Sequence, residues 1–380
     1  MTPQESRKLY PYLDTGMIYM NHAACSPLST PVVEQLNKYI HQRSVTHVEN
    51  FFDFLPVFEL AGKRLANLIN AEPERIAWRD NVTSGLNLLA QSLDLKKGDR
   101  IIINDLEFPA NVYPFLNLQS KGVIVDIVKS VDGKVDLEEI EACIRPETKL
   151  LSISQVQFLS GYRANLKKIG ELCKANDIIF CVDAIQGAGA VRIDVKDAQI
   201  DFLAGGTQKW LMGMQGVGYL YITKELQEKI EPAFVGWTSV NDAWNLLDYN
   251  LDLKDDASRF QIGTLSNSGL AAVEASLALM EEIGHDTIEE TVIENALFTA
   301  NKLEEYGFSP LLKNISKENL AGIVTVKIDN AKEIFDELMK KKIVLSEREG
   351  MIRFSPHFYN TKDEIEGVVK ILSGLQNKFK

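Results

Sequence analysis

A stretch in the middle of the chain constrains the fold most strongly, because short apolar runs there end in polar residues. Residues 178–182 (Ile-Ile-Phe-Cys-Val) are short and β-branched enough to predict a buried parallel strand, and the run stops at Asp183. Residues 200–204 predict a second strand that leads toward Lys209, and residues 216–222 predict a third. Ligands of open α/β sheets bind at the carboxyl ends of strands, so we expect Asp183 and Lys209 beside a ligand site.

An acid and a lysine in these positions suit one kind of cofactor. A carboxylate at a strand end can face a cationic ring nitrogen, and a lysine amine can form a Schiff base with an aldehyde. Pyridoxal phosphate needs both groups from the protein that holds it. We therefore interpret Asp183 and Lys209 as candidate partners of this cofactor.

Two motifs in the same stretch carry a family resemblance. Val182-Asp183-Ala184-Ile185-Gln186, followed by Thr207-Gln208-Lys209, resembles the class V aminotransferase family of fold-type I pyridoxal-phosphate enzymes. That family includes cysteine desulfurases, selenocysteine lyases, kynureninases and proteins like isopenicillin N epimerase. The resemblance extends from about Asn21 to Asn360 and so covers nearly all of the 380 residues.

The resemblance implies an α/β architecture. We expect a fold-type I large domain over residues 30–270, in which helices flank a mostly parallel sheet, and a smaller α/β domain over residues 271–380. Residues 1–29 would form a segment at the active-site mouth, associated with the small domain. The alternation of predicted strands and helices independently favours right-handed crossovers in a mostly parallel sheet.

The resemblance also implies a set of cofactor contacts. Asp183 would keep the pyridine nitrogen protonated, and Gln186 would hydrogen-bond the phenolic oxygen. Residues 76–87 predict a strand, a cap-rich turn and a helix start that match the family's phosphate cup, and a helix N-terminus favours a phosphate group. The implied contacts to the cofactor and its phosphate are Val82, Thr83, Thr207, Gln208 and, from the partner chain of a homodimer with shared active sites, Thr264.

Two positions depart from the family's pattern. Many relatives stack an aromatic ring, commonly histidine in the desulfurases, on the cofactor, and Phe108 holds that position here. A phenyl ring stacks and excludes water but carries no proton. Several relatives also contact the phenolic oxygen with Asn or Gln at a position that falls on Phe158, with Gln157 beside it.

Substrate contacts are expected from both ends of the chain. Residues 352–360 resemble the family's C-terminal motif, whose arginine, here Arg353, forks onto the substrate α-carboxylate; guanidinium matches a carboxylate bidentately. His357 lies in the same motif. In the family the N-terminal segment crosses the active-site mouth, so His22 and Ala24 are further candidates, and His22 is alternatively a structural histidine.

The family's chemistry begins with a Schiff base between Lys209 and the cofactor, which an amino-acid substrate displaces before Lys209 removes its α-proton. Transamination, racemisation and lyase routes then diverge. Cysteine desulfurases need a mobile C-terminal cysteine, and residues 344–352 (VLSEREGMI) contain none. We therefore expect an aminotransferase-like enzyme. Selenocysteine-lyase-like or cysteine-desulfurase-like activity, and isopenicillin-N-epimerase-like activity, are the alternatives.

Composition limits the kinds of binding partner and the cellular compartment that we expect for this protein. The formal net charge of −12 argues against nucleic acid, because phosphate backbones select basic surfaces. The four cysteines form no CxxC pair, and Cys173 and Cys181 sit in apolar patterns that predict buried thiols. Scattered, unpaired cysteines are typical of a reducing compartment, and the sequence shows no signal peptide and no apolar run of about 20 residues. We therefore expect a cytoplasmic protein that does not enter the membrane. We assign no metal ligands.

Two alternatives come from other classes of protein. A doubly wound sheet could bind a dinucleotide, but no G-x-G-x-x-G follows the first strands. A non-catalytic α/β scaffold is the second alternative, since fold does not imply function. The presence of Lys209, Asp183 and Arg353 together argues against it.

Overall fold

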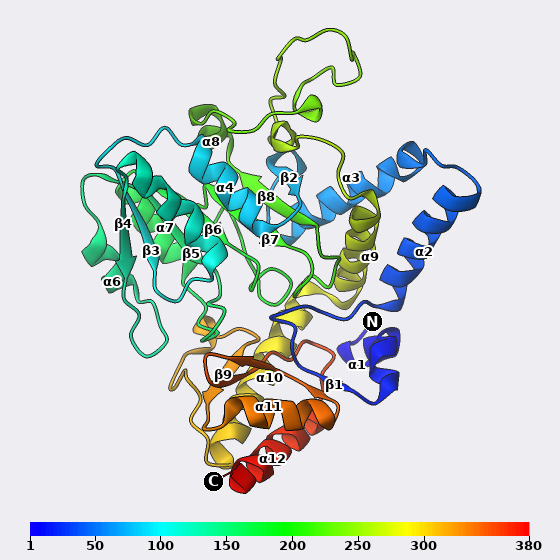
Figure 1. The fold of residues 1–380 in the computed structure, drawn as a ribbon, viewed down its shortest axis with the longest axis vertical. Helices are drawn as coiled ribbons and strands as arrows, with labels where there is room; N and C mark the ends of the chain where they lie inside the picture. The colour runs from blue at the N-terminus through cyan, green and yellow to red at the C-terminus, as the bar shows by residue number, and fades with distance from the viewer. Residues whose placement is uncertain (380) are drawn as a thin grey trace.

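The computed structural model describes residues 1–379 and shows a larger and a smaller α/β unit (Figure 1). The larger unit is built on seven strands, β2 (Ile76–Arg79), β3 (Arg100–Asn104), β4 (Ile124–Val128), β5 (Thr148–Ser154), β6 (Ile179–Asp183), β7 (Phe202–Gly206) and β8 (Gly218–Ile222). Their order across the sheet is β2-β8-β7-β6-β5-β3-β4. Strand β8 runs opposite to the other six strands, which share one direction, so the predicted mostly parallel sheet is confirmed.

Side chains along the strands alternate between two apolar cores, one on each face of the sheet. On β6, Phe180 and Val182 pack into one cluster and Cys181 into the other. The first cluster includes side chains of α3 (Phe51–Leu68), α7 (Leu166–Ala175) and α9 (Asn267–Ile283), and the second includes those of α4 (Val82–Ser92), α5 (Tyr113–Leu116) and α8 (Lys224–Lys229). Burial on both faces explains why these strands read as continuous apolar runs. Helix α6 (Leu137–Cys143) lies beside β4.

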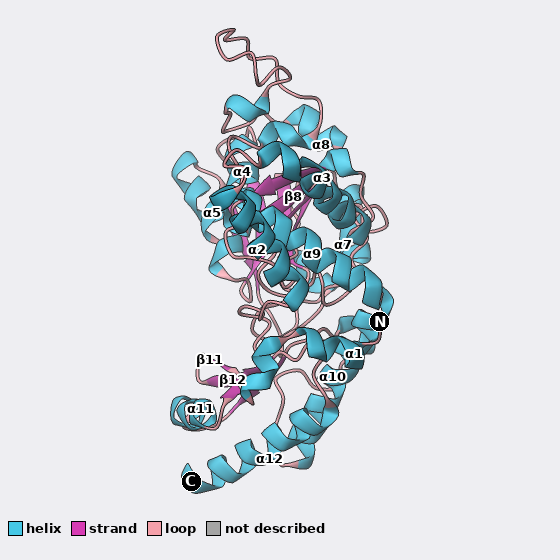
Figure 2. Cartoon of the chain, turned by 90° about the vertical axis from the view of Figure 1, so that its right-hand side faces the viewer, coloured by secondary structure: helices cyan, strands magenta, loops and turns pink. Residues whose placement is uncertain are grey.

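The smaller unit stands apart from the large sheet in the side view (Figure 2). It contains α10 (His285–Glu305), α11 (Ala331–Lys340), α12 (Lys362–Phe379) and an antiparallel sheet of β9 (Val324–Lys327), β12 (Met351–Phe354) and β11 (Ser346–Arg348). The unit has its own apolar core, which includes Val326, Ile334 and Val368.

The N-terminal segment joins the smaller unit. After α1 (Pro3–Ser6), strand β1 (Ile18–Tyr19) pairs in parallel with β10 (Ile343–Val344). Helix α9 packs on α3 and on α2 (Thr30–Val45), which belong to the large unit. We therefore propose that residues 1–29 associate with the small domain and that the boundary lies near Gly284, not at residue 270.

Two further expectations concern membranes and thiols. None of the helices within residues 1–379 is long and apolar enough to cross a membrane. All four cysteines are free, and Cys173 and Cys181 are buried as predicted.

The start of α12 links the small unit to the N-terminal segment through Glu364. Thr361 and Glu364 form a capping box, in which each backbone N–H donates to the other side chain, at 3.0 and 3.2 Å. Arg7 donates to both Glu364 oxygens at 3.0 and 2.7 Å and to the Tyr359 carbonyl at 2.6 Å. Burial raises the pKa of Glu364, but the hydrogen bonds from Arg7 and Thr361 outweigh burial and hold the pKa below its ordinary value of 4.5.

Arg7→Met should lower the free energy of unfolding by about 2 kcal/mol, because a half-buried carboxylate and a carbonyl lose their charged donor. The folded-state pKa of Glu364 is depressed, so this contribution is present above the unfolded-state pKa and is lost as the pH falls through the folded-state pKa. Urea denaturation at neutral and acidic pH should therefore show a deficit that shrinks in acid.

The exposed Lys332–Asp336 pair provides the matched control. Lys332→Met should change the free energy of unfolding by less than about 0.5 kcal/mol, because exposed ion pairs contribute little. Equal losses in the two variants, or a deficit in Arg7→Met that does not depend on pH, would contradict the role of Arg7.

Candidate active site

Asp183 and Lys209 come together at the carboxyl edge of the large sheet, as the sequence predicted. Asp183 is the last residue of β6, and Lys209 follows the end of the neighbouring strand β7. Burial raises the pKa of Asp183 and lowers that of Lys209, and the attraction between the two charges partly offsets both shifts. The pair therefore shares one electrostatic environment from which water is largely excluded.

One oxygen of Asp183 has no partner in the protein. Oδ1 accepts a hydrogen bond from the Ile185 N–H at 2.9 Å, whereas Oδ2 is buried and unpaired within the described residues. An unsatisfied buried carboxylate oxygen is destabilising, so a group that donates to it would be strongly favoured. A protonated pyridine nitrogen is such a donor. This part of the chain therefore fits pyridoxal phosphate.

Phe108 lies beside Lys209 and forms an apolar wall with Phe158. The Lys209 Nζ is 5.7 Å from the centroid of the Phe108 ring. The Phe158 ring meets Phe108 edge to face, with 5.3 Å between the centroids and 78° between the planes. Phe108 is 47% exposed, so one face remains open to a ligand. This placement suits the stacking role expected of Phe108.

The start of α4 has the form of an anion site. Asn81 caps the helix, and its Oδ1 accepts from the Ser84 N–H at 2.9 Å. Val82 is buried at the first position of the helix, and Thr83 is partly exposed at the second. We retain Val82, Thr83 and the partly exposed Gln208 as proposed phosphate contacts.

Thr207 does not fit its expected role. Its hydroxyl is fully buried and directed at the backbone carbonyls of Met214 and Val217, at 2.8 and 3.0 Å. The side chain therefore fixes the loop that carries Lys209 and presents no hydroxyl to a phosphate. We correct the expectation accordingly.

Gln186 is held between the N-terminal segment and Trp210. Its Nε2 donates to the Ala23 carbonyl at 3.0 Å, and its Oε1 accepts from the Trp210 Nε1 at 3.0 Å. The second N–H of the amide remains for the phenolic oxygen of a cofactor.

Ala24, next to Ala23, lies near the site as expected and is partly exposed. The segment that carries it is held against the Lys209 loop, because the Ser26 hydroxyl donates to the Lys209 carbonyl at 2.6 Å.

His22 and His357 are structural, which corrects their expected contact with substrate. Nδ1 of His22 faces the Ser355 carbonyl at 2.8 Å and must donate, so Nε2 accepts from the Tyr359 hydroxyl at 2.6 Å. A backbone N–H donates to Nδ1 of His357, so Nε2 donates to the Trp210 carbonyl at 3.0 Å. Both rings are fully buried, and burial lowers both pKa values, that of His357 to about 4.

Arg353 lies deep in the site with donors to spare. It is 2% exposed, its Nη1 donates to the Phe158 carbonyl at 2.7 Å, and its Nε has no partner among residues 1–379. Burial, followed by the charge of Arg348, lowers the pKa of Arg353 to about 10. A buried guanidinium with unused N–H groups suits the carboxylate contact expected of Arg353.

The sequence analysis missed Glu107, a second buried carboxylate near Asp183. It accepts five hydrogen bonds, from Asn104 (2.6 Å), Asn111 (2.9 Å), Gln157 (3.0 Å) and both the backbone and the hydroxyl of Ser154. The signal was an acid three residues after the end of an apolar strand. Gln157, which is fully buried, is thereby turned toward Glu107, while its Oε1 has no partner among residues 1–379.

Tyr219 is a further missed group. Its hydroxyl is buried without a partner in the described chain, and burial, followed by the charge of Asp183, raises its pKa. Gly205 makes room for the ring, because a Cβ there would lie 2.4 Å from it. Nothing in the local pattern of β8 separates this tyrosine from the other buried residues of the strand.

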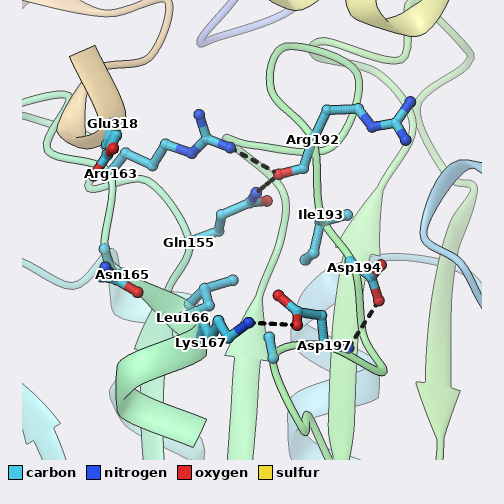
Figure 3. A pocket seen from close by; sticks show the side chains of 12 residues that line it. Gln155, Arg163, Asn165, Leu166, Lys167, Arg192, Ile193, Asp194, Asp197 and Glu318 are labelled. Carbon is cyan, nitrogen blue, oxygen red and sulfur yellow. Dashed lines mark hydrogen bonds and ion pairs between the residues drawn. The ribbon is translucent and has the colours of Figure 1, made fainter.

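A separate cavity of about 300 Å³ lies beside the start of α7 (Figure 3). None of the predicted site residues lines it. Its polar groups pair with one another: Arg163 and Gln155 both donate to the Arg192 carbonyl, and Lys167 pairs with Asp197. We therefore place the active site at Lys209 and not in this cavity.

Comparison with known proteins agrees with this geometry. Residues 18–368 match the family model described as Aminotransferase class-V. An uncharacterized aminotransferase, YcbU, of Bacillus subtilis (strain 168) is 31% identical over 369 residues, 97% of this chain and 96% of that protein. Isopenicillin N epimerase of Amycolatopsis lactamdurans is 26% identical over 386 residues, 96% of each chain.

A solved structure shows the same fold. The apo structure of a cysteine desulfurase from Thermococcus onnurineus NA1 superposes with a TM-score of 0.89 at 26% identity, covering 100% of this chain and 99% of that chain. The family match spans both units, the N-terminal segment from residue 18 and the strand edge that carries Asp183 and Lys209. The chain therefore belongs to the class V aminotransferase family of pyridoxal-phosphate-dependent enzymes.

Proposed function

We propose that this enzyme removes the α-proton of an amino-acid substrate and completes a transamination. The observation that carries the proposal is the unpaired, buried Oδ2 of Asp183 at the same strand edge as Lys209. Pyridoxal phosphate supplies an aldehyde that condenses with amines and a ring that stores the electron pair left by proton removal.

The surroundings of each residue suit it to a different role in the reaction. Asp183 holds a proton on the ring nitrogen, since its buried carboxylate gains its missing partner only from a cation or a donor. Lys209 serves as the base, because burial lowers its pKa and enlarges the fraction of neutral amine. Arg353 holds the substrate carboxylate, and Phe108 excludes water from one side of the site.

The C-terminal hairpin argues against a desulfurase outcome. Strands β11 and β12 are joined directly through Glu349 and Gly350, and this hairpin contains no cysteine that could take up sulfur. Of the four cysteines, Cys25 is the one whose charge affects the pKa of Lys209, so it is the cysteine to consider as a sulfur acceptor. Burial raises the pKa of its thiol, which disfavours the reactive thiolate.

Racemisation lacks the acid that it needs on the second face of the substrate. His22 and His357, the candidates for that role, are buried with both ring nitrogens engaged. Phe108 and Phe158 carry no exchangeable proton. Lys209 is then the main proton carrier, and transamination is the outcome that a single carrier on one face can complete.

Borohydride reduction of the holoenzyme should fix a pyridoxyl group to Lys209, and peptide mass mapping should locate it. Incubation with a panel of L-amino acids should convert the cofactor spectrum to that of its pyridoxamine form, without loss of optical activity and without sulfide release. Lys209→Arg is the control, since it keeps the cation but cannot form the Schiff base. A label on another lysine would sink the proposal, and rapid sulfide release would sink the assigned outcome.

Asp183→Asn should lower kcat by about 100-fold or more, because the ring nitrogen loses its anionic partner and with it the proton. Stability should change much less, since Asn keeps the shape and the acceptor for the Ile185 N–H. Asp201→Asn is the matched control: Asp201 is half-buried and likewise accepts from a backbone N–H, that of Phe180, at 2.8 Å, at the opposite end of the sheet. Similar turnover in the two variants would contradict the role of Asp183.

We also propose that the enzyme is a homodimer with shared sites. The exposed large apolar residues gather on α2, α3 and the loop that projects from the top of the large unit in Figure 1. They include Ile40, Phe52, Trp244, Leu247 and Tyr249, the last two 85% and 91% exposed. A surface of this kind is typical of a subunit interface. Thr264 is exposed close to the same loop in the chain, as a residue serving the partner's site would be.

Co-expression of differently tagged Lys209→Ala and Thr264→Val chains should give heterodimers with activity, although each variant alone is impaired. Each heterodimer would hold one intact site, so random mixing should restore about a quarter of the wild-type activity. Co-expression of each variant with itself is the control. A fully active monomer, or heterodimers as inactive as the parents, would refute the shared site.

The reducing cytoplasm remains the proposed location. All four cysteines are free, two of them buried, and none is placed to form a disulfide. Thiol titration of the freshly isolated protein would reveal any oxidised pair.

A further inference from the structure

The β11–β12 hairpin presents two arginines on one face. Its register pairs Ser346 with Arg353 and Arg348 with Met351. Directly opposed residues and residues two apart on a strand point to the same face of a sheet, so Arg348 and Arg353 project from the same side. They are diagonal neighbours, whose backbones lie about 7–8 Å apart in antiparallel strands. Their long side chains can therefore reach one small ligand.

The two arginines differ in depth. Arg353 is 2% exposed and holds the proposed α-carboxylate position at the bottom of the site. Arg348, which pairs with Met351, lies nearer the hairpin turn than Arg353, and its side chain is exposed. A ligand held by Arg353 would therefore extend outward past Arg348.

Arg348 has no acidic partner in the part of the chain that the structure describes. Its one hydrogen bond is a long contact of 3.4 Å to the carbonyl of the adjacent Glu347. Several other arginines pair with a carboxylate, as Arg7 and Arg163 do at 2.7 and 2.6 Å. The guanidinium of Arg348 is thus available to an anion from outside the chain.

The charge of Arg348 also reaches the reacting centre. Burial is the main cause of the lowered pKa values of Lys209 and Arg353, and the positive charge of Arg348 lowers both further. Among the charged groups that act on Lys209, Asp183 is the one carboxylate, whereas both guanidinium groups are cationic. Two cationic guanidinium groups therefore act on Lys209, in a protein whose formal net charge is −12.

We propose that Arg348 binds a second anionic group of the substrate, so that the enzyme prefers amino acids whose side chains carry a carboxylate. This inference rests on the proposed function, in which Arg353 takes the α-carboxylate. The facing wall of Phe108 and Phe158 offers no hydrogen bond, so the side-chain charge is read by Arg348. A hydrogen bond to a charged group is worth about tenfold to 100-fold in affinity.

The test compares matched acidic and neutral substrates on the holoenzyme. L-aspartate and L-glutamate should convert the cofactor spectrum with a kcat/KM about tenfold or more above that of L-asparagine and L-glutamine, which have the same shape without the charge. Arg348→Gln should abolish this preference by lowering kcat/KM for the acidic pair far more than for the neutral pair, and Arg348→Lys should restore part of it. Lys341→Gln, which removes an exposed cation outside the site, should preserve the preference.

Calorimetric titration gives a readout that does not depend on turnover. Succinate should bind the holoenzyme more tightly than butyrate, and Arg348→Gln should bring the two affinities together. Added salt should weaken the binding of succinate more than that of butyrate, because salt screens exposed charge pairs.

The outcomes separate this inference from the proposed function. Equal rates for acidic and neutral amino acids, or an equal loss for both in Arg348→Gln, would overturn the role of Arg348 while the borohydride label on Lys209 still stood. If no amino acid changed the cofactor spectrum and no label formed on Lys209, the proposed function would fail, and the preference for acidic substrates would fall with it.

Discussion

The burial of two opposite charges, Asp183 and Lys209, at one edge of the large sheet is the constraint on which the rest of the structure depends. Two desolvated groups of opposite charge compensate each other only in part, and here Oδ2 of Asp183 has no donor within the described part of the chain. That arrangement persists because β6 and β7 are covered by apolar cores on both faces, so the strand ends cannot relax toward water. The fold thus preorganises an acceptor for a cationic ring.

Glu107 shows how hydrogen bonding separates a structural carboxylate from a functional one. Both carboxylates are buried at the carboxyl edge of the sheet, Asp183 at the end of β6 and Glu107 in the loop after β3, and the charge of Glu107 contributes to the raised pKa of Asp183. Glu107 accepts five hydrogen bonds and so fixes the loops that follow β3 and β5. Asp183 accepts one and keeps an oxygen free for a ligand. Satisfaction of the acceptors, rather than burial, decides which acid can serve the chemistry.

The site is assembled from both units. The large unit supplies Asp183, Lys209 and the phenylalanine wall, whereas Arg353 comes from β12 of the small unit and reaches the Phe158 carbonyl. The N-terminal segment joins them, through Ala23 to Gln186 on one side and through His22 to Tyr359 on the other. Two histidines that resemble substrate ligands in the sequence therefore hold the units together.

The sequence alone determined the strand that ends at Asp183, the next strand, which leads toward Lys209, and the capped helix start before Thr83, because periodicity and turn chemistry are local. The role expected of Arg353 came from the family resemblance. Tertiary structure alone decided that Thr207, His22 and His357 turn inward. The hydrogen-bond partners of a buried polar side chain are set by long-range packing, as with the Ser355 carbonyl that fixes His22 from the far end of the chain. Likewise, only the hairpin register places Arg348 on the face of Arg353, since a shift of one residue would turn it away.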